Sequence, residues 1–100
     1  MELYKQVTRY GKLLRRNDSD TISEKIYRYN GLNYIVLMEL GKVKDIYTVD
    51  INTVIDTALE LNSECTIINY IDKFWVDDKI TYQQLNQIRN EIKKRYYATR

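Results

Sequence analysis

The stretch Ser23–Asp50 decides the fold, and it reads SEKIYRYNGLNYIVLMELGKVKDIYTVD. Alternating apolar and polar side chains over residues 24–50 are typical of three consecutive strands. Asn30-Gly31 lies between the first two of them. A two-residue type I′ loop needs positive φ at both central positions, and this dipeptide supplies it at low cost. The stretch therefore predicts a three-stranded antiparallel β-meander with its first hairpin centred on Asn30-Gly31.

The meander has two faces, because successive side chains of a strand point to opposite sides. With Asn30-Gly31 as the first loop and Gly41-Lys42 as the second, one face is rich in tyrosine and the other is aliphatic. The tyrosine face is expected to carry Tyr27, Tyr29, Tyr34, Val36, Met38, Tyr47 and Val49. The aliphatic face is expected to carry Ile26, Ile35, Leu37 and Ile46, and to be buried under helices.

The candidate partner-binding residues are the four tyrosines of the first face: Tyr27, Tyr29, Tyr34 and Tyr47. Tyrosine offers a large, rigid contact area with a hydrogen-bonding tip, so an exposed face of this kind suits a protein partner or stacked bases. The alternative is that cross-strand tyrosine pairs only stabilise the sheet. The exposure of the four side chains decides between these interpretations.

The rest of the chain completes a single small α+β domain over residues 1–100. Residues 1–16 have apolar side chains at helical spacing, although strand propensity and Gly11 keep a strand open as the alternative. Residues 51–97 read as helical. The predicted architecture is the meander packed with a C-terminal helical hairpin and one or two further helices.

Two local signals mark this helical region. Thr81 is followed three residues later by Gln84, which predicts a capping box at the start of the last helix. Trp75 is the only tryptophan, and it is expected to be buried where the preceding helix ends.

The run IDKFWVDDKITYQQLNQI at residues 71–88 contains an apolar helix end, a short acidic turn, an Ile-Thr step and a polar second helix. On these features, residues 65–97 resemble the helical hairpin of the short C-terminal (SHOCT) family. Asp78 stands where such a turn would use glycine. The resemblance implies a hairpin that serves oligomerisation and interaction, and it assigns no functional residue.

The net charge of +2 conceals basic ends and an acidic middle. Residues 1–16 hold one acid and five bases, residues 17–64 nine acids and four bases, and residues 65–100 four acids and seven bases. If the ends meet, they form a positive patch suited to nucleic acid. The candidate nucleic-acid-binding residues are Arg9, Lys12, Arg15, Arg16, Lys93, Lys94 and Arg95. The alternative is that these charges only solubilise the ends.

Catalysis has little support in the sequence. The chain contains no histidine, no phosphate-cradling glycine loop and no dinucleotide fingerprint, and the lone Cys65 has no metal-ligand spacing. We therefore expect no catalytic residue, no metal site and no cofactor. One enzyme class stays open, a small metal-independent ribonuclease toxin that works with side chains such as Arg28, Lys44, Tyr47 and Arg95.

These observations predict a non-enzymatic binding protein whose partner is another protein, with nucleic acid as the alternative partner and a homodimer also compatible. The excess of Ile, Tyr, Lys and Asn over Gly and Pro is typical of AT-rich codons. That bias indicates a phage or mobile-element accessory protein that binds and modulates a host or defence protein. We expect it in the bacterial cytoplasm, because no apolar run is long enough to span a membrane and the N-terminus lacks a signal pattern.

Overall fold

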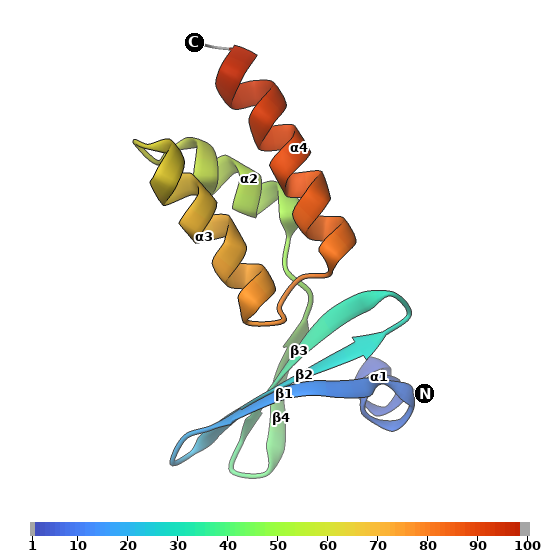
Figure 1. Cartoon of the computed structure of the whole chain (residues 1–100). Helices are drawn as coiled ribbons and strands as arrows, with labels where there is room; N and C mark the ends of the chain where they lie inside the picture. Colours follow the sequence, from blue (N-terminus) through green and yellow to red (C-terminus); the bar gives the residue numbers. More distant parts are fainter. Residues whose placement is uncertain (1, 99–100) are drawn as a thin grey trace. The chain divides into compact units, whose positions relative to one another are not determined.

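The computed structural model describes residues 2–98, and its elements fall into two compact units. One unit ends at Thr48 and the other begins at Val49. We call them the sheet unit and the helical unit. The prediction is one small domain over residues 1–100, and the described residues 2–98 comprise two units that are each continuous in sequence (Figure 1).

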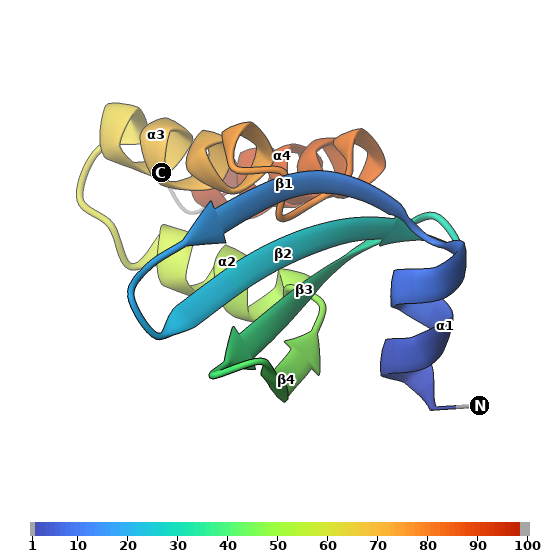
Figure 2. The ribbon, with the colours of Figure 1, turned by 90° about the horizontal axis from the view of Figure 1, so that it is seen from below.

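The sheet unit consists of one helix followed by four strands (Figure 2). The α+β class is confirmed, whereas the prediction of three strands is wrong. The strands pair antiparallel in the order β1-β2-β3-β4, so each neighbours the next in sequence. The elements are α1 (Leu3–Tyr10), β1 (Lys12–Asp18), β2 (Ile22–Tyr29), β3 (Leu32–Glu39) and β4 (Lys42–Tyr47).

The first predicted hairpin is confirmed, register included. Tyr29 pairs with Leu32 and Tyr27 with Tyr34 across β2 and β3. Asn30 and Gly31 both have positive φ, at 50° and 78°. The loop is therefore of the kind that the Asn-Gly dipeptide favours.

The second predicted hairpin is wrong in its loop and in its register. The loop is Leu40-Gly41, where φ is 51° and 77°, instead of Gly41-Lys42. A register shift between Leu37 and Met38 then pairs β3 with β4 so that Val36 faces Ile46 and Ile35 faces Tyr47. Because paired residues share a face, Tyr47 lies on the aliphatic face and Ile46 on the tyrosine face, the reverse of the prediction.

The N-terminal segment is both helix and strand. A single helix over residues 1–16 is not what the structure has, because α1 ends at Tyr10 and β1 begins at Lys12. Gly11 explains the break, because a Cβ atom there would lie 2.4 Å from the carbonyl oxygen of Val7 and 3.0 Å from that of Arg28. Only glycine allows the chain to turn this closely against its own helix and the next strand.

The helical unit contains α2 (Ile51–Leu59), α3 (Glu64–Val76) and α4 (Tyr82–Ala98). Side chains cap the start of each helix. The Asp50 carboxylate accepts from the Asn52 amide at 3.0 Å in α2, and the Ser63 hydroxyl accepts from the Thr66 amide at 3.2 Å in α3. The buried core joins all three helices and consists of Val54, Ile55, Ala58, Ile67, Ile71, Ile80, Leu85, Ile88 and Ile92.

The capping box at the start of α4 is confirmed. The amide of Gln84 donates to the Thr81 hydroxyl at 3.1 Å, and the Thr81 amide donates back to the Gln84 side chain at 2.8 Å. The prediction that Trp75 is buried is wrong, because 44% of it is exposed. Within residues 2–98, no helix combines the length and apolar character needed to cross a membrane.

Candidate functional site

The tyrosine face is partly covered by α1 and is not an open platform. The Tyr29 hydroxyl donates to Gln6 of α1 at 3.3 Å, and Tyr27, Tyr29 and Tyr34 are all half-buried. Tyr29 and Tyr34 have their rings tilted against each other at 6.2 Å. Burial, and then the neighbouring Tyr4, raise the pKa of Tyr27. These contacts favour a role for the three rings in packing the sheet against α1.

Tyr47, the fourth candidate, lies on the opposite face of the sheet, with 39% of it exposed. Burial raises its pKa, followed by the effect of the carboxylates of Glu24 and Asp45 on that same face. The structure therefore brings together three of the four predicted tyrosines.

The predicted basic residues are divided between the two units. Arg9, Lys12, Arg15 and Arg16 belong to α1 and β1, and Lys93, Lys94 and Arg95 belong to α4. Among them, Arg16 binds Asp18 at 2.8 Å and Arg95 binds Glu91 at 2.8 Å. The pKa of Asp18 is lowered, mainly by a hydrogen bond from Ser23 and then by Arg16.

The side chains considered for a ribonuclease have structural partners. Arg28 donates to the buried Asn33 on the neighbouring strand. Lys44 forms an ion pair with Glu39 at 3.3 Å, across the β3–β4 hairpin. Another of these side chains, Arg95, belongs to the helical unit, where it binds Glu91. Hydrogen bonds and ion pairs thus account for the positions of Arg28, Lys44 and Arg95.

The turn between β3 and β4 carries an unusual leucine. Leu40 is 78% exposed and its φ is 51°, in the left-handed region. Apolar side chains on the surface are ordinary when isolated, but this conformation costs a non-glycine, non-asparagine residue about 1 kcal/mol. The backbone amide of Leu40 donates to the Thr21 carbonyl at 3.1 Å, a bond that any residue except proline would form. Nothing in the fold thus requires leucine at this position.

The neighbours of Leu40 make this turn a distinct surface. We call it the hairpin tip. Val43 adds a second apolar side chain that is 37% exposed, and Lys42 and Lys44 lie on either side of it in the sequence. A shallow hollow against the tip is lined by Glu39, Leu40, Lys42, Val43 and Lys44.

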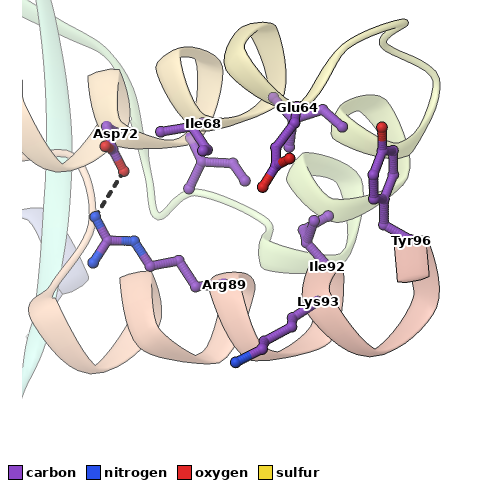
Figure 3. A pocket seen from close by; sticks show the side chains of 9 residues that line it. Glu64, Ile68, Asp72, Arg89, Ile92, Lys93 and Tyr96 are labelled. Carbon is purple, nitrogen blue, oxygen red and sulfur yellow. Dashed lines mark hydrogen bonds and ion pairs between the residues drawn. The ribbon is translucent and has the colours of Figure 1, made fainter. Parts of the chain in front are cut away.

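A second surface lies on the helical unit, where α3 and α4 run side by side (Figure 3). A groove of about 430 Å³ separates their exposed faces. We call it the α3–α4 groove. Its floor is apolar, and the Asp72–Arg89 ion pair at 2.9 Å bridges it at one end. The lining residues are Glu64, Ile67, Ile68, Ile71, Asp72, Arg89, Ile92, Lys93 and Tyr96.

Exposed apolar side chains extend this groove toward the turn between the helices. Ile68 and Trp75 are seven residues apart on α3, as are Tyr82 and Arg89 on α4, and seven residues make about two helical turns. Trp75 and Tyr82 therefore share the faces that line the groove, and their rings meet edge to face at 6.4 Å. The exposed fractions are 48% for Ile68, 44% for Trp75 and 59% for Tyr82.

Neither surface is predicted by the sequence reasoning above. The even spacing of Ile68, Trp75 and Tyr82 can indicate a shared exposed surface, but the prediction that Trp75 is buried argues against it. Leu40 is likewise missed, because the prediction assigns it to a strand next to the wrongly placed loop. No protein-family model, curated protein or solved structure matches the chain. Among the described residues 2–98, no group of three or more histidine, cysteine or acidic side chains is arranged to hold a metal ion.

Proposed function

We propose that the protein is a non-enzymatic binding protein that attaches to another protein through the hairpin tip. The observation that carries the proposal is Leu40, which is exposed and conformationally strained at once. Residues held in strained backbone conformations of this kind cluster at functional sites. Burial of an exposed leucine in a pocket contributes about 1.5–3 kcal/mol, which exceeds the cost of the strained turn.

The surroundings of Leu40 favour a partner pocket with an apolar floor and an acidic rim. Lys42 and Lys44 lie on either side of Val43 and line the same hollow as the leucine, and Lys44 forms an ion pair with Glu39. Such an arrangement combines an apolar anchor with basic side chains that select an oppositely charged rim. The AT-rich codon bias supports the further proposal that this is an accessory protein of a phage or mobile element, acting on a host or defence protein.

The strain at Leu40 leads to a prediction about stability, and the first hairpin supplies the control for it. We expect Leu40→Asn to raise the free energy of unfolding of the sheet unit by about 1 kcal/mol, because asparagine tolerates the left-handed region. Asn30 has nearly the same φ, 50° against 51°, so Asn30→Leu should lower the stability by a similar amount. Native-state hydrogen exchange of the β2–β4 amides measures both. A Leu40→Asn variant no more stable than the wild type contradicts the assignment of strain.

The binding test uses the same substitution. Immobilised wild-type protein should recover one stoichiometric protein from a lysate of the native host, and Leu40→Asn should lose it although the fold is more stable. Leu13→Asn is the matched control, because Leu13 is 47% exposed and pairs with Tyr27 on the tyrosine face.

The recovered material separates the candidate binding surfaces. Loss of the protein with Leu40→Asn alone supports the hairpin tip, and loss with Leu13→Asn alone transfers the site to the tyrosine face. Recovery of nucleic acid only, weakened when Arg15 and Arg16 are neutralised, supports the alternative of a nucleic-acid-binding protein. Recovery of neither contradicts the proposed function.

A further inference from the structure

The α3–α4 groove carries an inference that is independent of the hairpin tip. We propose that a second copy of the chain occupies this groove, and that the two copies form a symmetric dimer through their helical units. Three observations support this dimer: the exposed apolar side chains, the distribution of charge over the two walls and the direction of the two helices.

The exposed apolar side chains of this surface favour a partner that buries them. Ile68, Trp75 and Tyr82 are each about half exposed along one line of the surface, above a floor of isoleucines. Aromatic and aliphatic side chains that are grouped in this way are typical of interface centres.

The two walls of the groove have opposite charge. The α3 wall contributes Glu64 and Asp72, and the α4 wall contributes Arg89 and Lys93. Asp72 and Arg89 lie at one end, and Glu64 and Lys93 lie toward the other (Figure 3). A surface with one acidic wall and one basic wall is complementary to a copy of itself that presents the walls in exchanged order.

A two-fold axis parallel to the groove makes this exchange. It places α3 of one copy over α4 of its partner and keeps each residue at its own level along the groove. Glu64 then meets Lys93 of the other copy. Because α3 and α4 of one chain are antiparallel, every neighbouring pair of helices in the assembly is also antiparallel, which is the arrangement of an up-down four-helix bundle.

A different protein would have to present an acidic and a basic flank at matching positions to fit the same groove. A second copy already has both the acidic and the basic flank, so it is the occupant that we propose. It also brings its own half-exposed Ile68, Trp75 and Tyr82, which cover those of the first copy.

The test exploits the exchange of walls. Alone, Glu64→Lys places a lysine opposite Lys93 twice in a dimer, and Lys93→Glu places a glutamate opposite Glu64 twice. Each variant should raise the dimer dissociation constant about tenfold, since two attractive contacts become repulsive. In the mixed dimer of an equimolar mixture of the two variants both contacts are attractive, because Lys93 of one copy meets Glu64 of the other and the two substituted residues meet with their charges reversed. The mixture should therefore associate more tightly than either variant alone.

Sedimentation and light scattering measure the mass, which should be twice that of the 12.1 kDa chain for the wild type and for the mixture. The emission of Trp75 should shift to the red on dilution, because dissociation exposes the ring. Lys94→Glu is the control, because it makes the same charge change one residue away from the groove face. Circular dichroism of each variant checks that its fold is retained.

A wild type that stays monomeric at every concentration overturns the proposal. A dimer that responds to Lys94→Glu as much as to Lys93→Glu, or a mixture that does not recover, overturns this two-fold arrangement. None of these outcomes affects the hairpin tip, because the lysate experiment with Leu40→Asn is read independently of the oligomeric state.

Discussion

The substitution Ile88→Ala should lower the free energy of unfolding of the helical unit by about 2–5 kcal/mol, one of the two largest effects that we expect in this protein. Ile88 has an exposed fraction of 0% and belongs to the core that joins α2, α3 and α4. Its truncation removes apolar contacts and leaves a cavity that neighbouring side chains refill only in part.

Trp75 provides the measurement, because it is the only tryptophan of the chain and lies in α3 of the same unit. Urea unfolding followed by its emission reports the stability of the helical unit. The neighbouring, exposed Asn90→Ala is the control and should change the stability by less than about 0.5 kcal/mol. If the two substitutions have equal effects, the packing of α4 described above is incorrect.

The second large effect is expected for Gly11→Ala in the sheet unit. The added Cβ would lie 2.4 Å from the Val7 carbonyl oxygen, which belongs to the backbone and has no rotamer to change. Relief of the clash requires α1 to move relative to β2. This movement would disturb the fully buried Val7 and the bond between Tyr29 and Gln6.

We expect Gly11→Ala to cost about 1–3 kcal/mol, and to increase hydrogen exchange in α1 and at the start of β1. Lys12→Ala, at the exposed neighbouring position, is the control and should be nearly neutral. Gly11 has an ordinary φ of −77°, so the cost comes from crowding alone. Unchanged exchange in α1 would show that the contact between Gly11 and Val7 is looser than described.

Local signals account for what the sequence predicts correctly. Asn30-Gly31 determines its hairpin because both residues tolerate the backbone that the turn needs. Thr81 and Gln84 determine the start of α4 because a capping box involves residues only three apart. In both cases, all the interacting atoms belong to one short segment.

The errors arise where distant contacts decide the structure. Leu40 adopts a conformation that its own propensity opposes, so the predicted loop lies one residue too late. The register shift at Leu37/Met38 then reverses the faces of Ile46 and Tyr47. In the sequence, Gly11 reads only as a residue that weakens a helix. The structural reason for glycine is its close approach to Arg28 of β2, a contact that the sequence alone does not show. Apolar spacing alone likewise places Trp75 inside the core, although it is half exposed.

The order of the strands has a consequence for how the chain folds. Each strand pairs only with its neighbour in sequence, so every hairpin closes a short loop and loses little entropy on forming. We expect the sheet to form rapidly from the Asn30-Gly31 turn outward. Because the sheet unit is also complete by Thr48, it is free to fold during synthesis before the ribosome has released the three helices.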